Sequence, residues 1–132
     1  MKKSKYSSKD EHDIVLYKLL NILDSSKNDI YPNILKDERA TKLKSLTPDI
    51  ILTKKNETQV QIILEVETAE TVSVDQIPKW TIFSNEALHF YLIVPKNMKK
   101  EAEELCINNQ VSCTVLTYLI NEEGGIEEIE TY

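Results

Sequence analysis

The sequence predicts an α/β protein in which helices flank a central mixed β-sheet. Short apolar runs, each long enough for a single strand, alternate with segments of helical periodicity. Two early strands are separated by a brief polar connection, which is typical of an antiparallel hairpin. The later strands are separated by helical segments, which predicts crossover connections and parallel pairing. The expected order is α-β-β-β-α-β-α-β.

The first predicted helix begins at a capping box, Ser8-Lys9-Asp10-Glu11, and ends near Ser25-Ser26. Its apolar face consists of Ile14, Leu16, Leu19, Leu20 and Leu23. A short strand follows at 30–35. Because Pro32 has no N–H to donate, this strand is expected at an edge or a bulge. The charged stretch 36–45 has no apolar periodicity and is predicted to be a loop.

The hairpin is predicted from strands at about 47–53 and 59–67, joined by polar residues 54–57. A second helix is expected to begin at Ser73, with Gln76 as its capping-box partner, and to run to about Asn85. Pro78 falls near its first turn, where a missing N–H costs little. The apolar residues of this helix are Ile77, Trp80, Ile82 and Phe83.

The stretch Leu88–Val94 is almost continuously apolar, which predicts an interior strand covered on both faces. A third helix is expected from a cap at Asn97 to about Asn109, followed by a strand at 111–119. A turn at a glycine pair then leads into 126–132, either an acidic tail or a short edge strand. The residues of the third helix expected to point inward are Ala102, Leu105 and Ile107.

The 132 residues are predicted to form one domain over 1–132, with a disordered N-terminus at 1–7 and an acidic tail at 121–132. No apolar run approaches the roughly 20 residues of a membrane span, and no secretory signal is recognisable. We therefore expect a cytoplasmic protein without a membrane partner. The two cysteines, Cys106 and Cys113, match no zinc pattern and are interpreted as small apolar residues.

The net charge of −6 argues mildly against a large nucleic-acid footprint. However, basic residues gather around Asp49 in the sequence. They either form a basic rim near a site or are solvated loop residues. They are Lys36, Arg39, Lys42, Lys44, Lys54 and Lys55.

Three carboxylates are predicted to converge at one end of the hairpin. Glu65 and Glu67 are two residues apart in a strand, so their side chains share a face, and Asp49 at the neighbouring strand can join them. Such carboxylates repel one another unless a cation or protons neutralise them. The oxygen ligands predict a Mg²⁺ or Mn²⁺ site formed by Asp49, Glu65 and Glu67.

Pro48-Asp49 and Glu65-Val66-Glu67, in this order and strand context, resemble the signature of the PD-(D/E)XK nuclease-like superfamily. The resemblance spans roughly residues 8–95 and implies the restriction-endonuclease-like core, α-β-β-β-α-β, here with an added helix and strand. In size and layout the chain is similar to archaeal Holliday-junction resolvases. The segment from Gln76 to Trp80 also looks like the superfamily's Gln-x-x-x-Tyr, with Trp in place of Tyr.

The resemblance implies a Mg²⁺- or Mn²⁺-dependent phosphodiester hydrolase, a DNA endonuclease. Asp49 and Glu65 would then be direct metal ligands, and Glu67 a general base or a ligand of a second metal. Gln76 and Lys79 would contact phosphate or water, and Glu11 would reach the metal through water. The alternatives to these functional roles are structural: helix capping for Glu11 and Gln76, and a core position for Trp80. His12 and His89 are assigned no role.

The chain departs from the pattern at Glu67, which replaces the motif lysine. Some restriction enzymes with Glu at this position are active, and a migrated lysine, with Lys79 as the candidate, is a second explanation. The third is a catalytically inactive domain that binds nucleic acid or a protein partner. Because resolvase-like members are dimers, a homodimer is also expected, through an apolar strand edge or the region 118–120.

Overall fold

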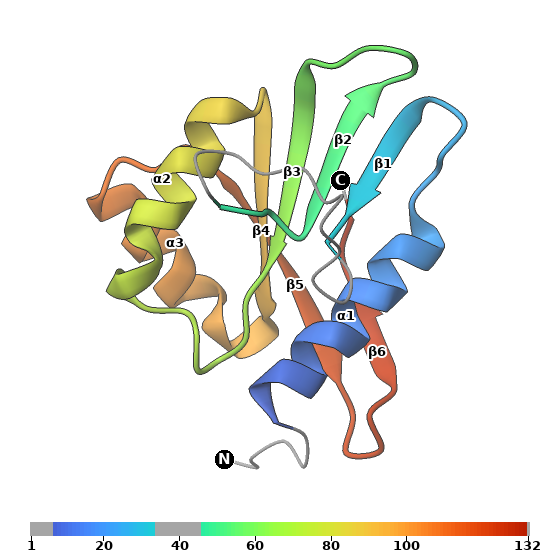
Figure 1. Ribbon diagram of the computed structural model, residues 1–132. Coiled ribbons are helices and arrows are strands. Elements are labelled where there is room, and N and C mark those ends of the chain that lie inside the picture. The colour runs from blue at the N-terminus through green and yellow to red at the C-terminus, as the bar shows by residue number, and fades with distance from the viewer. Residues whose placement is uncertain (1–6, 34–45, 132) are drawn as a thin grey trace.

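A computed structural model describes residues 7–33 and 46–131 of the chain (Figure 1). Residues 1–6, residue 132 and residues 34–45, which include the whole predicted loop at 36–45, lie outside the described residues. The elements are α1 (Ser8–Ile22), β1 (Asn28–Pro32), β2 (Ile50–Lys54), β3 (Val60–Val66), η1 (Val74–Gln76), α2 (Ile77–Glu86), β4 (His89–Pro95), η2 (Lys96–Met98), α3 (Lys99–Asn108), β5 (Thr114–Ile120) and β6 (Ile126–Ile129).

The strands form one six-stranded sheet in the order β1-β2-β3-β4-β5-β6. The pairs β1–β2, β2–β3 and β5–β6 are antiparallel, whereas β3–β4 and β4–β5 are parallel. The two parallel pairs are connected by α2 and α3, as the helical periodicity between the strands predicted. The predicted α/β fold with a mixed sheet is therefore confirmed.

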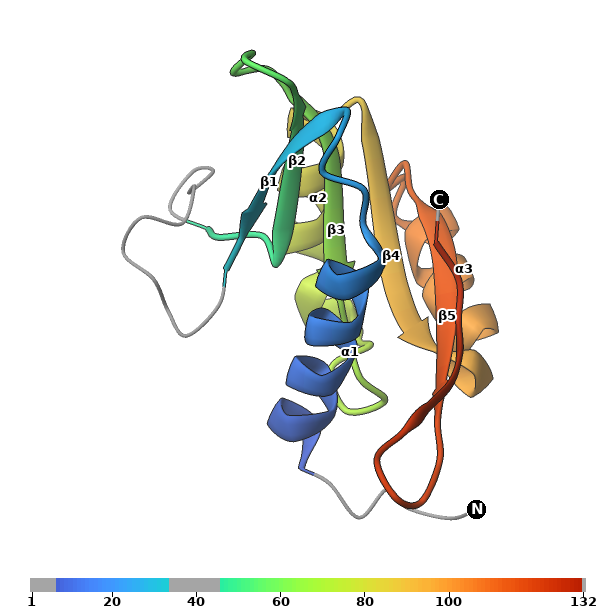
Figure 2. The ribbon, with the colours of Figure 1, turned by 90° about the vertical axis from the view of Figure 1, so that its right-hand side faces the viewer.

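Helices cover both faces of the sheet (Figures 1 and 2). On one face α1 buries Val15, Leu16 and Leu19 against alternate residues of β2 and β3. On the other face α2 contributes Trp80 and Phe83 to a second core that also includes Ala102 and Cys106 of α3. The central strand β4 contributes to both cores, which explains its nearly continuous apolar sequence.

The start of α1 differs from the prediction by one residue. The N-cap is Ser7 instead of Ser8, and its hydroxyl accepts a hydrogen bond from the Asp10 N–H at 3.1 Å. Consequently Glu11 is not the capping-box partner, and its carboxylate is directed to a tyrosine described below. The sequence Ser7-Ser8 offers two equivalent caps, and local pattern alone does not choose between them.

The second helical segment begins where it was predicted, because Ser73 is the N-cap of η1, which leads directly into α2. Ser73 makes no side-chain capping hydrogen bond, so Gln76 has no capping-box partner. The start of the third helix and one core position were predicted incorrectly. Met98, not Asn97, is the N-cap of α3, because a 3-10 turn precedes that helix. Ile107 is 75% exposed, not inward. Ala102 and Cys106, four residues apart, define the buried face instead.

The sheet edges are β1 and β6, which confirms the edge position predicted from Pro32 and the edge-strand alternative for the C-terminal segment. Because β6 pairs with β5, the region 118–120 is no open edge. Tyr118 is only 2% exposed, so its assignment to a dimer interface was wrong. No helix among the described residues is both long and apolar enough to cross a membrane.

Candidate functional site

The three carboxylates of the sequence motif lie at one end of the β2–β3 hairpin. Asp49 directly precedes β2, Glu65 belongs to β3 and Glu67 follows it. The antiparallel register pairs Ile50 with Leu64, which sets the beginning of β2 beside the end of β3. All three side chains are buried, with residue exposures of 7%, 5% and 4%.

Backbone hydrogen bonds hold Asp49 and Glu65 next to each other. The Asp49 N–H donates to Oε1 of Glu65 at 2.9 Å, and the Val66 N–H donates to Oδ2 of Asp49 at 2.8 Å. Each strand therefore fixes a carboxylate of the other, and neither side chain can swing out without breaking a buried hydrogen bond. This reciprocal arrangement orients both carboxylates before any ligand arrives.

Lys79 of α2 lies between the two glutamates. Its Nζ is 2.9 Å from Oε2 of Glu65 and 3.0 Å from Oε2 of Glu67. Burial by itself lowers the pKa of Lys79, but the two carboxylates more than reverse this effect, and the net pKa is raised. The ammonium thus stays charged and partly neutralises the site. The sequence had indicated this lysine only through its position on the helix that follows the hairpin.

Glu67 is held by Trp80 as well as by Lys79. The indole Nε1–H of Trp80 donates to Oε2 of Glu67 at 2.7 Å, and the Trp80 residue is completely buried. A buried indole normally finds an acceptor, and here that acceptor is a carboxylate. Trp80 therefore has its expected core position and also orients Glu67.

We expect Trp80→Phe to lower the free energy of unfolding by about 2 kcal/mol, because Glu67 loses a buried donor. Part of this loss comes from the smaller ring, so urea unfolding should be compared across a double-mutant cycle with Glu67→Met. A coupling energy of about 1 kcal/mol or more between the two positions is expected. Additive effects would show that the hydrogen bond contributes nothing.

His12 is a member of the site that the sequence interpretation missed. Its Nε2 is 3.0 Å from Oδ2 of Asp49, and its Nδ1 is 3.1 Å from Oδ1 of Asp13. The hydrogen bond with Asp49 is the main reason that the pKa of His12 rises to about 9, with burial opposing the rise. At neutral pH the imidazolium is a second internal cation beside the carboxylates.

A sequence signal for His12 did exist. The residue precedes Leu16 by four positions and Leu19 by seven, which places it on the buried stripe of α1. A histidine on that stripe needs a polar partner, and the end of the hairpin supplies one. By contrast His89, the other histidine, is exposed on β4.

The remaining predicted site residues lie further from the carboxylates. Glu11 accepts a hydrogen bond from the Tyr118 hydroxyl at 2.7 Å, and that hydroxyl is also 3.1 Å from the backbone carbonyl oxygen of Glu67. Glu11 is thus linked to the site through Tyr118, whose pKa is raised mainly by burial. Gln76 is half-buried at the end of η1, and its side chain makes no capping hydrogen bond.

Only two of the six residues of the predicted basic rim lie in the described part of the chain. Four of its six residues lie in the undescribed stretch 34–45. Lys54 is the last residue of β2, about 13 Å from Ile50 at the usual rise per strand residue, and Lys55 follows it. Lys55 there pairs with Asp29 at 3.3 Å. These two lysines therefore do not flank the carboxylates.

The charge balance of the site remains negative. Asp49, Glu65 and Glu67 contribute three carboxylates, and Lys79 and His12 contribute two cations. Burial, followed by the charge of Asp49, raises the pKa of Glu65 well above its ordinary value. A proton or an added cation would relieve this repulsion. The raised pKa of Glu65 therefore favours protonation of this carboxylate at a higher pH than usual.

Within residues 7–33 and 46–131, no three His, Cys, Asp or Glu side chains form a group able to hold a metal ion. The Glu67 oxygen is engaged by Trp80 and Lys79, which separates its environment from that of the Asp49–Glu65 pair. The pair itself fits the donor set of Mg²⁺, which commonly uses one or two carboxylates and fills its shell with waters or substrate phosphates.

Comparison with protein-family models, curated proteins and solved structures found no match for the chain.

Proposed function

We propose that the protein is a Mg²⁺- or Mn²⁺-dependent phosphodiester hydrolase acting on DNA, with Asp49 and Glu65 as the metal-binding residues. The observation that supports this most is the meeting of a fixed Asp49–Glu65 pair with Lys79 at one end of the sheet. Hydrolysis of a phosphodiester requires charge neutralisation and an activated water. A carboxylate pair and an ammonium group are suited to these tasks.

In this proposal the residues of the chain have separate roles. Asp49 and Glu65 would hold the cation, which would supply Lewis acidity and activate a water. His12 and the Val66 N–H keep the Asp49 carboxylate in one orientation. Lys79 faces the scissile phosphate and carries the function of the motif lysine. Glu67 and Trp80 position that ammonium, so Glu67 is assigned neither a general-base role nor a second metal.

A second function, a catalytically inactive domain that binds nucleic acid or a protein partner, is favoured by one specific observation. Both glutamates are already paired with Lys79, and Asp49 with His12, so internal cations neutralise most of the cluster. A buried, mutually satisfied ionic cluster can be purely structural. The two functions differ in whether an added divalent cation binds.

We expect calorimetric titration of Mn²⁺ into the protein to show binding that Asp49→Ala abolishes. Asp29→Ala is the matched control, because Asp29 is a carboxylate of β1 that lies beside the turn of the hairpin and pairs with Lys55. Binding lost only in the first variant would support the hydrolase and justify cleavage assays on branched, single-stranded and duplex DNA. No binding at millimolar Mn²⁺, with or without DNA, would favour the inactive domain.

A further inference from the structure

The two cysteines approach each other closely on the α3–β5 side of the molecule. Cys106 lies in α3 and Cys113 directly precedes β5, and their Sγ atoms are 3.1 Å apart. The intervening chain is held in a tight turn, with the Val111 N–H donating to the Cys106 carbonyl at 2.8 Å and Gln110 at φ 57°. The turn therefore keeps the two sulfurs together.

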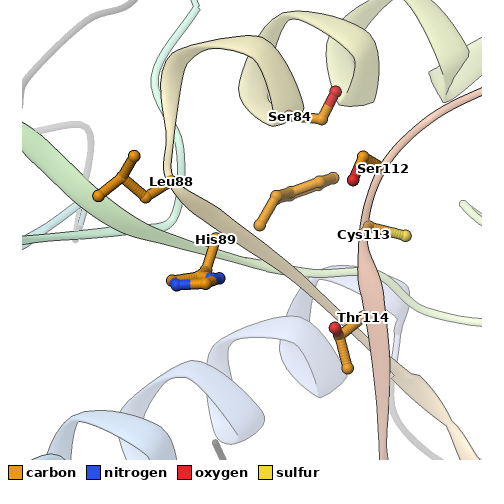
Figure 3. A pocket seen from close by; sticks show the side chains of 7 residues that line it. Ser84, Leu88, His89, Ser112, Cys113 and Thr114 are labelled. Carbon is orange, nitrogen blue, oxygen red and sulfur yellow. The ribbon is translucent and has the colours of Figure 1, made fainter.

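The two cysteines differ in burial. Cys113 is half-buried and is one of the residues that line a small hollow of about 110 Å³, together with Ser84, His89, Ser112 and Thr114 (Figure 3). Figure 3 shows the Cys113 sulfur directed away from Ser84 and His89, so the sulfur faces its partner and not the hollow. Cys106 is 3% exposed.

The pair is also chemically polarised. Cys113 Sγ–H donates to Cys106 Sγ, and this hydrogen bond lowers the pKa of Cys106. The same hydrogen bond raises the pKa of Cys113, so Cys106 is the sulfur that loses its proton more readily. Two sulfurs that share a hydrogen bond in this way are placed for thiol–disulfide chemistry.

We propose that Cys106 and Cys113 form a peroxide-oxidisable dithiol that closes to a reversible disulfide. One of the two sulfurs attacks one oxygen of H₂O₂, the O–O bond breaks, and the displaced hydroxide takes the thiol proton and leaves as water. That cysteine is then a sulfenic acid. The other sulfur displaces its hydroxyl, which leaves as a second water with the second thiol proton. Both sulfurs are oxidised, and one H₂O₂ is reduced to two waters.

The closure requires little movement, since the sulfurs need to approach by only about 1 Å to reach the roughly 2.05 Å of a disulfide bond. None of the hollow's residues belongs to the carboxylate cluster. The dithiol therefore stands independently of the proposed hydrolase.

The test is to treat the folded, reduced protein with one equivalent of H₂O₂, block remaining thiols and digest it with trypsin. Because no Lys or Arg follows Lys100, both cysteines fall in the peptide 101–132. We expect this peptide to be unblocked and about 2 Da lighter than its reduced form, without fragment ions from between the cysteines. Dithiothreitol should restore the reduced mass and two blockable thiols.

Cys106→Ser and Cys113→Ser are the paired controls, and circular dichroism should first show that each is folded. In each variant we expect the remaining thiol to stop at the sulfenic acid, which dimedone traps, because no second sulfur is present to displace its hydroxyl. Two blockable thiols in the treated wild-type protein would overturn the proposal. So would stepwise oxygen addition without loss of the two hydrogens, a result that needs neither variant.

Discussion

Replacing Lys79 by Met should lower the free energy of unfolding by about 3 kcal/mol at pH 7. The substitution keeps most of the side-chain volume but removes the ammonium that contacts both Glu65 and Glu67. Two buried carboxylates would then face each other and Asp49 without that cation. Removing one partner of a buried ion pair typically costs several kcal/mol, and the partial exposure of Lys79, 26% of its side chain, keeps the estimate at the lower end.

The loss should depend on pH in a defined direction. The pKa of Glu65 is already raised by burial, and removal of Lys79 removes an interaction that lowers it. Lowering the pH protonates the carboxylates and relieves their repulsion. The stability deficit of the variant should therefore shrink from pH 7 towards pH 5 in urea unfolding experiments.

Lys96→Met is the matched control, because Lys96 pairs with Glu128 at the same 2.9 Å while both side chains are more than half exposed. Solvent screens such a pair, and the stability should hardly change. Equal effects of the two substitutions would contradict the view that Lys79 neutralises a buried cluster. The same would follow if the deficit of Lys79→Met were independent of pH.

The meeting of Asp49 with Glu65 could be predicted because it depends on local rules. A short polar connection predicts an antiparallel hairpin, and strand alternation then fixes which side chains share a face. The position of Lys79 near the carboxylates could be predicted in the same way, because the crossover helix begins near the end of β3 and packs back on the sheet. These contacts follow from neighbouring elements in the chain.

The contact between His12 and Asp49 could not be derived in this way. It joins residues 37 positions apart on elements whose relative placement depends on how α1 docks on the sheet. Periodicity indicates which face of α1 is buried but not which strand end that face meets. Likewise Glu11 was assigned to helix capping or to a metal, whereas Tyr118, 107 residues away, is its partner.

The error at Ile107 has a different origin. An apolar residue was taken as inward on its hydrophobicity alone, although its position one residue after Cys106 turns it by about 100° from the buried face. The wrong helix starts have a similar cause. Several residues near each start can act as caps, and tertiary packing chooses among them.

The protein should become less stable as the pH rises from about 6.5 to 9, with His12 contributing on the order of 2–3 kcal/mol to the change. The pKa of His12 is about 9 in the folded protein and 6.5 as its ordinary value. Because the folded state binds the proton more tightly, the stabilisation is fully present below pH 6.5 and is lost as the pH passes through 9. Its source is chiefly the hydrogen bond with Asp49.

His12→Gln isolates this contribution, since glutamine can still donate a hydrogen bond to Asp49 but does not titrate. We expect the variant to be less stable than the wild type at pH 6, with the difference shrinking towards zero at pH 9.5 as the histidine loses its proton. His89→Gln, on exposed β4 surface, should leave the profile unchanged. Urea unfolding across this range measures both variants against the wild type. A stability difference between wild type and His12→Gln that does not change with pH would show that the imidazole is not a charged partner of Asp49. Lys79 would then be the one internal cation of the two assigned to the cluster, and the cluster would carry more negative charge.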